Sequence, residues 1–184
     1  SDVCSSDLPF IFGTVSCFKK QKNLFDLLQA FSLVYQNHPQ ARLEIIGDGI
    51  LRPELEAWIT RHQLTEVITL HGWVYHVAPL MKLWHVFVMS SLWEGLPCAA
   101  VEARFLKLPV LAYNVGGLSD IIYSGKNGFL YNPGDIQGLS SGMISLLTNR
   151  QLYTELKDFH EDLSTFTIDA MLLQHSMLYR STLK

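Results

Sequence analysis

The sequence predicts an α/β fold, a Rossmann-like parallel sheet with helices on both faces, and three observations support this prediction. Short apolar runs such as Ala41 to Ile46 are typical of buried strands. Segments between them carry apolar residues at helical spacing, as at Leu24, Leu27, Leu28 and Phe31. The loops that join these segments are short. Strands that alternate with helices in this way form a parallel sheet that helices cover on both sides.

In the first half of the chain, the strands and helices follow from apolar runs, periodicity and turn residues. Pro53 marks a helix start, because its φ suits the first turn and it has no N–H to lose. The Gly47-Asp48-Gly49 turn ends a strand, and we interpret Asp48 as a residue that stabilises this turn. The expected strands are Phe10 to Phe18, Ala41 to Ile46, Val67 to Leu70 and Trp84 to Met89, and the expected helices are Leu24 to Val34, Pro53 to His62 and Pro79 to Leu83.

The second half repeats the alternation in weaker form. A strand begins at Pro109-Val110, a turn at 126–128 precedes a short strand, and Asp135 is placed to cap the next helix. The last helix has an apolar face of Met171, Leu172, His175, Leu178 and Tyr179. The expected elements are helices Cys98 to Phe105, Leu118 to Tyr123, Ile136 to Leu147, Gln151 to His160 and Ile168 to Leu183, with a strand at Phe129 to Tyr131.

Composition limits the class of protein. The chain has 184 residues, 48% of them hydrophobic, and a net charge of -3, enough for one core and one domain. The mildly acidic balance argues against nucleic acid as a partner, since phosphate-tracking surfaces need clustered Lys and Arg. No apolar run is long enough for a bilayer, and no secretory signal is visible. Cys4, Cys17 and Cys98 lack metal-ligand or disulfide spacing, so we expect a reduced, cytoplasmic setting.

The first eight residues, SDVCSSDL, differ in character from the rest of the chain. They are small and polar, and DVCSSDL is what a common sequencing adapter encodes in one reading frame. Our hypothesis is that residues 1–8 are not native and that residues 9–184 form the domain. A natural, disordered N-terminus is the alternative, and the upstream genomic sequence would decide between the two.

The stretch from Ser90 to Asp120 carries the strongest chemical signal. Pro97 suits the first helical position, which places Glu94 in a loop and Glu102 in the second turn of the following helix. A helix start presents free N–H groups and a positive dipole end, which favour a phosphate. An ionised carboxylate only accepts hydrogen bonds, so a pair of sugar hydroxyls is its natural partner. Phosphate and polyol together indicate a nucleotide sugar.

This stretch resembles the signature of the family 4 retaining glycosyltransferases of GT-B fold, in the C-terminal, donor-binding domain. The signature is Glu, seven residues, Glu, then a Pro-Val strand and a Gly-Gly turn, here Glu94, Glu102, Pro109-Val110 and Gly116-Gly117. The resemblance covers roughly Phe10 to Lys184. Two positions depart from it, because Lys107 stands where the family usually has glycine and Asp120 where it usually has glutamate.

The resemblance implies roles for several residues. Glu102 would hold the ribose hydroxyls and Glu94 the hydroxyls of the transferred sugar, with no covalent role. The family's first loop carries an arginine and, five residues later, a lysine, both on the donor diphosphate. Lys22 matches the lysine, while Cys17 occupies the arginine position and Ser16 that of the preceding glycine. For the lysine run taken alone, a solvated surface is the alternative interpretation.

Further donor contacts are implied at two loops. The turn of Gly72 and Trp73 would meet the nucleotide base through backbone groups, with simple packing as the alternative. Backbone N–H groups of the loop from Gly95 through Leu96 and Pro97 to Cys98 would support the diphosphate. A thiol at a helix start can be acidified, but we interpret Cys98 as small-residue packing beside the ligand. The expected catalytic pair is therefore Glu94 and Lys22.

The resemblance also implies partners. There is no Asp-x-Asp motif, so we expect neither metal nor cofactor, only a nucleoside-diphosphate sugar as donor. A glycan or lipid-linked acceptor would bind through an N-terminal domain missing from this sequence, so the fragment alone should be inactive. The expected setting is envelope polysaccharide or lipopolysaccharide synthesis in the cytoplasm, with peripheral association at the inner face of the membrane. A nucleotide-sugar epimerase and a non-catalytic sugar-nucleotide binding module remain as alternatives.

Overall fold

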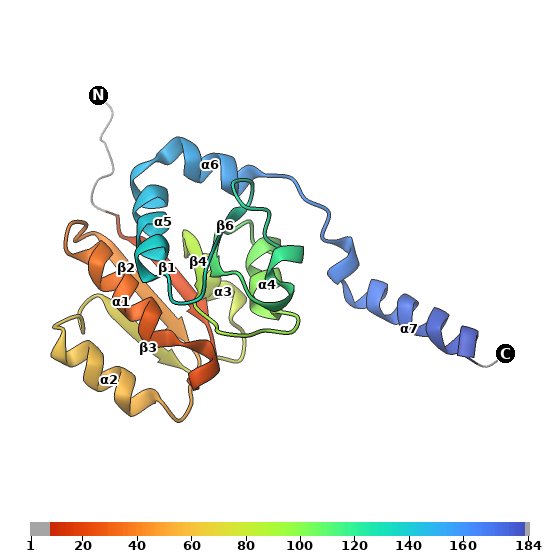
Figure 1. Cartoon of the computed structure of the whole chain (residues 1–184), viewed down its shortest axis with the longest axis horizontal. Helices are drawn as coiled ribbons and strands as arrows, with labels where there is room; N and C mark the ends of the chain where they lie inside the picture. The colour runs from red at the N-terminus through yellow and green to blue at the C-terminus, as the bar shows by residue number, and fades with distance from the viewer. Residues whose placement is uncertain (1–7, 183–184) are drawn as a thin grey trace.

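The computed structural model describes residues 8–182 and contains one six-stranded sheet in which all pairings are parallel. The strand order is β3-β2-β1-β4-β5-β6, with helices on both faces (Figure 1). The predicted fold class is therefore confirmed. The strands are β1 Phe10–Val15, β2 Ala41–Ile46, β3 Ile68–Gly72, β4 Val86–Met89, β5 Val110–Tyr113 and β6 Gly128–Tyr131. The hypothesis about the adapter-like N-terminus, including Cys4, concerns residues that lie almost entirely outside the described part.

Seven α-helices and three short 3-10 helices connect or follow the strands within residues 8–182. The α-helices are α1 Leu24–Tyr35, α2 Arg52–Arg61, α3 Ala78–Met81, α4 Cys98–Phe105, α5 Ile136–Thr148, α6 Arg150–Asp158 and α7 Ile168–Thr182. The 3-10 helices are η1 Lys20–Lys22, η2 Gly116–Asp120 and η3 Ser164–Phe166. None of the helices in this range is long and apolar enough to cross a membrane.

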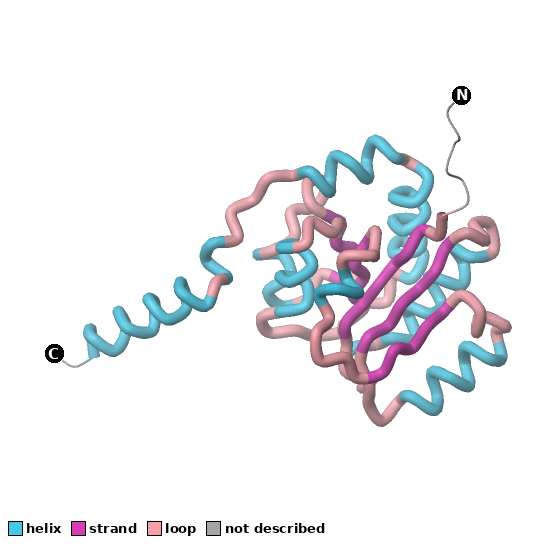
Figure 2. The backbone as a smooth tube through the Cα atoms, turned by 180° about the vertical axis from the view of Figure 1, so that it is seen from behind, coloured by secondary structure: helices cyan, strands magenta, loops and turns pink. Residues whose placement is uncertain are grey.

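Two apolar cores sandwich the sheet. Side chains of α1, α2, α5 and α6 pack on one face, and those of α3, α4 and η2 pack on the other. Figure 2 shows the long strands β1 and β2 running side by side between these layers. On the first face, the Tyr113 hydroxyl donates to Asp26 Oδ2 at 2.8 Å, which ties β5 to α1. Burial, followed by this bond, raises the pKa of Tyr113.

The strand order reverses between β1 and β4, which are neighbours although six other elements, η1, α1, β2, α2, β3 and α3, separate them in sequence. In open α/β sheets, ligands bind at the carboxyl ends of the strands where the order reverses. Gly13 makes this pairing possible on one face, because a Cβ there would lie 2.0 Å from the Trp84 ring. The expected site loops therefore emerge at the same edge of the sheet.

Several predicted boundaries are wrong by a few residues. The strand expected to reach Phe18 ends at Val15, so residues 16–19 form a loop. The strand expected from Trp84 begins at Val86, since Trp84 itself packs beneath β1. Residues 116–120 form a 3-10 helix instead of a helix from Leu118 to Tyr123. In each case tertiary contacts, which periodicity does not report, decide where the element ends.

The segment between α6 and α7 is held to the sheet domain by buried polar contacts of Glu161. Arg104 of α4 donates to Glu161 Oε1 at 2.5 Å, and their side chains are 1% and 8% exposed. Asn127 donates to the other oxygen of Glu161 at 2.7 Å. Beyond this anchor, α7 projects away from the sheet (Figures 1 and 2). Apolar residues of α7, such as Met171 and Leu172, are exposed.

Candidate functional site at the carboxyl edge of the sheet

The loop after β1 is held by the turn that follows β2. The N–H of Ser16 donates to Ile46 O at 2.9 Å, and that of Phe18 donates to Asp48 O at 2.8 Å. A Cβ at Gly47 would lie 1.9 Å from Ser16 O, and its φ of +128° suits only glycine. The backbones of the two loops therefore touch, and this contact fixes the positions of Ser16 and Cys17.

The η1 helix is joined to the loop after β4 by several hydrogen bonds. The Ser90 hydroxyl donates to the carbonyls of Lys22 at 3.1 Å and Asn23 at 2.9 Å. The Leu92 N–H donates to Gln21 O at 2.8 Å, and the Gln21 side chain donates to Trp93 O, also at 2.8 Å. The two loops at the point where the strand order reverses thus form one connected unit.

Lys22 and Glu94 form an ion pair at the centre of this unit. The Lys22 Nζ donates to Glu94 Oε1 at 2.5 Å, and the two side chains are 19% and 7% exposed. The backbone of Glu94 rests on the next turn, since a Cβ at Gly116 would lie 1.9 Å from Glu94 O. The Gly117 N–H donates to Gly95 O at 3.2 Å. The Gly-Gly turn therefore supports the loop that carries Glu94.

A pocket of about 420 Å³ opens beside this ion pair. Its wall includes Ser16, Cys17 and Lys22 from the first loop, Trp73 from the turn after β3, and Glu102 from the second turn of α4. The Trp73 side chain is 77% exposed, so an aromatic surface stands at the pocket mouth. The structure thus brings together five of the sequence-predicted residues, and Glu94 joins them through its bond to Lys22.

The remaining predicted residues lie around this pocket rather than in its wall. Gly72 precedes Trp73, has a φ of +75° and accepts the Gly47 N–H at 2.8 Å. Pro97 is the N-cap of α4 and not its first helical residue, which corrects the prediction. Its ψ of 78° is not helical. Leu96 is 59% exposed.

The start of α4 offers fewer free N–H groups than the sequence indicated. The Cys98 N–H donates to Leu96 O at 3.0 Å, so it is not available to a phosphate. Among the described residues, the N–H groups of Leu96 and Ala99 donate no backbone hydrogen bond outside the helices and strands. Cys98 is exposed at this helix start, and its packing beside a ligand stays a prediction.

Sequence reasoning missed part of the pocket wall. Val15, Ile46, Val74 and Val77 provide apolar surface, and Gly47 lies between the two loops. The Gly47-Asp48-Gly49 turn after a buried strand was a usable signal for Gly47. The apolar residues carried no signal, because their positions depend on which strands are neighbours.

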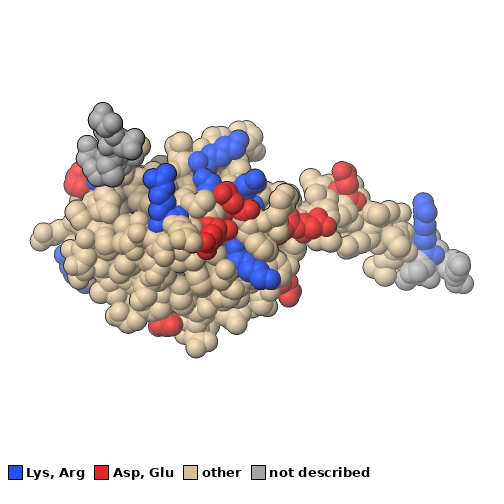
Figure 3. Space-filling view, turned by 90° about the horizontal axis from the view of Figure 1, so that it is seen from above, with Lys and Arg blue, Asp and Glu red and all other residues tan. Residues whose placement is uncertain are grey.

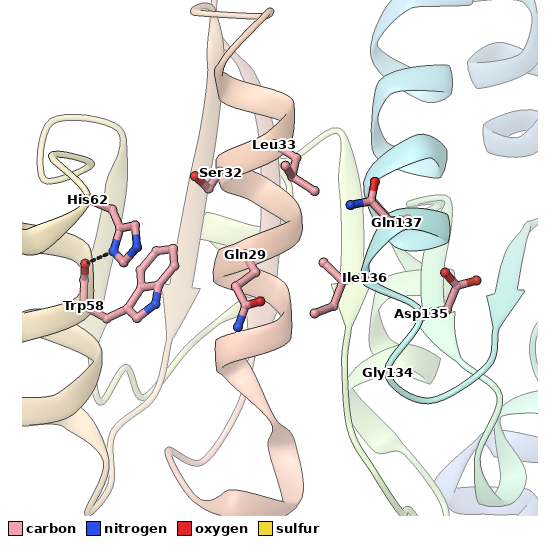
Figure 4. Close-up of a pocket in the computed structure, with 9 residues that line it drawn as sticks. All are labelled: Gln29, Ser32, Leu33, Trp58, His62, Gly134, Asp135, Ile136 and Gln137. Carbon is pink, nitrogen blue, oxygen red and sulfur yellow. Dashed lines mark hydrogen bonds between the residues drawn. The ribbon is translucent and has the colours of Figure 1, made fainter.

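A second hollow lies on the helical face, among α1, α2 and the start of α5 (Figure 4). Its volume is about 500 Å³, somewhat larger than the pocket at the carboxyl edge. However, it contains none of the predicted residues, and its acidic side chain, Asp135, already caps α5 by accepting the Gly138 N–H. His62 and Trp58 stack on one another at its rim. We therefore place the candidate site at the carboxyl edge.

Charged side chains form neither a single-sign patch on the face in Figure 3 nor, among the described residues, a cluster suited to a metal ion. On the face in Figure 3, Lys and Arg are interspersed with Asp and Glu. Within residues 8–182, no group of three or more His, Cys, Asp or Glu side chains could hold a metal ion. The charged groups that distinguish the pocket are thus Lys22 and Glu102, with Glu94 behind them.

The chain matches a known family over most of its length. The family described as "Glycosyl transferases group 1" matches residues 5–161. An Escherichia coli protein named UDP-Gal:alpha-D-GlcNAc-diphosphoundecaprenol alpha-1,3-galactosyltransferase is 30% identical over 146 residues, which are 78% of this chain and 38% of that protein. The chain spans less than half the length of the curated relatives it matches, from 22% to 45%.

Solved structures share the fold. Sucrose-phosphate synthase from Thermosynechococcus elongatus superposes with a TM-score of 0.85 at 25% identity, over 97% of this chain and 46% of that one. Anabaena HepE, crystallised in complex with UDP, gives a TM-score of 0.83 at 22% identity, over 97% of this chain and 50% of that one. The described sheet and helices therefore have the arrangement found in GT-B glycosyltransferases.

Proposed function

We propose that this chain, which belongs to the glycosyl transferases group 1 family, carries the donor site of a family 4 enzyme that transfers a hexose with retention of configuration. The chain is a glycosyltransferase domain, and the donor in our proposal is a nucleoside-diphosphate sugar. The observation that carries the proposal is the position of Lys22, which pairs with Glu94 at 2.5 Å and shares a pocket with Glu102.

The proposed chemistry follows from the charges around the pocket. Breaking the anomeric C–O bond leaves negative charge on the nucleoside diphosphate, and fixed donors at that oxygen lower the barrier. Lys22 supplies one donor, and the N–H groups of Leu96 and Ala99 at the start of α4 supply others. These amides replace the Cys98 N–H of the sequence-based expectation, because that group is already bonded.

The two glutamates have separate roles in this proposal. Glu102 is exposed and lies in the pocket wall, where its oxygens can accept both ribose hydroxyls. Glu94, which is paired with Lys22 beside the pocket, accepts the hydroxyls of the transferred sugar in this proposal without forming a covalent bond. Trp73 and Gly72 flank the place for the base. In this arrangement the phosphates lie between two carboxylates, next to the ammonium.

The acceptor belongs to the rest of a longer chain in our proposal. The curated relatives are more than twice as long as the matched segment, and the E. coli relative is named for a lipid-diphosphate acceptor. We propose an acceptor of that class, a glycan or lipid-linked saccharide in envelope polysaccharide or lipopolysaccharide synthesis. The reaction would take place in the cytoplasm, at the inner face of the membrane. The domain alone then binds donor but does not turn it over.

Calorimetry of the chain with UDP, GDP and ADP tests the donor site. Glu102→Ala removes charge-assisted hydrogen bonds worth roughly 1.5–3 kcal/mol, so affinity should fall about ten- to a hundredfold. Lys22→Ala should lose affinity for the diphosphate in the same way. Glu66→Ala and Lys126→Ala are matched controls, because these exposed residues precede β3 and β6 and lie at the opposite edge of the sheet.

The controls should bind as the unaltered chain does. If Glu102→Ala and Lys22→Ala also bind unchanged, the donor-site assignment is wrong. Cys17, which stands in the family's arginine position, favours a second candidate, a non-catalytic sugar-nucleotide binding module. That candidate gains support if the longer protein binds donor normally but transfers no sugar, and Cys17→Arg restores transfer.

A further inference from the structure

Ser91 carries a buried hydroxyl that no other described residue satisfies. The residue is 1% exposed, and its Oγ has no hydrogen-bond partner. Within residues 8–182 it is the only buried side-chain nitrogen or oxygen in this state. Leaving a buried hydroxyl unpaired costs about 1–3 kcal/mol, so such a group in a native protein needs an explanation.

The neighbours of Ser91 prevent it from turning to solvent. The Ser90 hydroxyl is bonded to two carbonyls of the η1 segment, and the Leu92 N–H is bonded to Gln21 O. Ser91 is therefore held between two anchored residues, directly after β4.

Ser91 and Lys22 line the same small hollow, which lies next to the donor pocket and shares Val15, Ser16 and Lys22 with its wall. The hollow is too small to admit a water molecule. The Ser16 and Ser90 hydroxyls in its wall already donate to carbonyl oxygens. Lys22 is the one charged residue in this wall. It still has free donors, because an ammonium has three N–H bonds and one of them goes to Glu94.

We propose that Ser91 is a positioning residue for Lys22 in the donor-bound state. When a nucleoside diphosphate occupies the pocket, its phosphates compete with Glu94 for the Lys22 ammonium, and the hold of Glu94 on Lys22 loosens. The ammonium then donates to the Ser91 hydroxyl, and this bond keeps it in place beside the phosphates. The inference rests on the proposed donor site. It explains why an unpaired hydroxyl is retained beside the one cation of the pocket wall.

The test measures both stability and ligand binding, because the proposal predicts that replacing Ser91 raises stability and lowers nucleotide affinity. Ser91→Ala removes the unpaired hydroxyl without adding atoms, so the midpoint of thermal unfolding should rise by about 2–4 °C. The same variant should bind UDP, GDP or ADP, whichever the unaltered chain binds, roughly three- to tenfold more weakly. Ser90→Ala is the control, since losing a satisfied hydroxyl should lower the midpoint.

Two further measurements separate positioning from a general structural effect. Binding of the parent nucleoside, followed by ligand-observed NMR, should be unchanged in Ser91→Ala, because the nucleoside has no phosphate for Lys22. In a Lys22→Met background, Ser91→Ala should cause no further loss of diphosphate affinity. An equal loss for nucleoside and diphosphate, a loss that persists without Lys22, or no loss at all overturns the proposal.

The outcomes also distinguish this inference from the proposed function. If Lys22→Ala and Glu102→Ala lose nucleotide binding but Ser91→Ala does not, the donor site stands and only the role of Ser91 is rejected. If those two variants bind as the unaltered chain does, the proposed function fails and the role of Ser91 fails with it.

Discussion

Replacing Gly116 with alanine should displace the loop that carries Glu94. A Cβ at this position would lie 1.9 Å from Glu94 O and 2.7 Å from the carbonyl carbon. Non-bonded heavy atoms have their optimum at roughly 3.5 Å, so the two backbones must separate by more than about 1 Å. Because Glu94 holds Lys22 at 2.5 Å, a shift of this size breaks the ion pair or moves both residues.

The expected magnitude has two parts. The φ of Gly116 is +53°, and a residue with a Cβ loses about 1–2 kcal/mol in this left-handed region. The clash adds a strain of about 1–3 kcal/mol, typical of overpacked sites. We therefore expect a loss of about 2–5 kcal/mol in the free energy of unfolding, and at least tenfold weaker binding of nucleoside diphosphate.

Gly125→Ala is a matched control for this variant. Gly125 also has a positive φ, +81°, but no atom lies within 4 Å of a Cβ built there. It should lose only the backbone contribution of about 1–2 kcal/mol and keep its nucleotide affinity. Urea unfolding and calorimetry give both quantities for each variant. Equal stability losses in the two variants, together with unchanged binding by Gly116→Ala, would refute the argument.

Two other predictions concern stability. Lys107 has a φ of +58° just after α4, so Lys107→Gly should raise the free energy of unfolding by about 0.5–1 kcal/mol. Lys107→Ala keeps the backbone strain and should give no such gain. A gain in both variants would contradict this explanation. Glu161→Ala leaves Arg104 buried without its carboxylate, so the free energy of unfolding, measured by heat or urea, should fall by about 3–5 kcal/mol. Glu56→Ala removes an exposed pair with Arg52 and should lower it by less than about 1 kcal/mol. Similar losses in the two variants would show that burial does not matter here.

Local sequence signals were sufficient to predict most strands and helices and to identify the charged residues of the candidate site. The apolar run of β2 and the periodicity of α1 matched the structure closely, because strand and helix patterns depend on residues near in sequence. Glu102 lies in the second turn of α4 as expected, since a helix starting at Cys98 leaves no other place for it. The positive φ of Lys107 also accounts for the glycine that the resembling family usually has there.

Other features depended on contacts between distant segments. Pro97 looked like a first helical residue but is the N-cap, because the loop before it is drawn toward the Gly116 turn. The Cys98 N–H appeared free from sequence but is bonded within its own loop. The unpaired Ser91 hydroxyl has no sequence signal, since a buried group lacks a partner only after the surrounding side chains have packed.

The sequence by itself determined that strands and helices alternate and that a lysine and two glutamates lie in segments following or flanking strands. Only the tertiary structure decided that β1 and β4 are neighbours, which brings Lys22 within hydrogen-bonding distance of Glu94, 72 residues later. The physical reason is that strand order depends on which apolar faces pack together across the whole domain. Close backbone approaches at Gly47 and Gly116 then hold the loops together, and these contacts exist only in the folded chain.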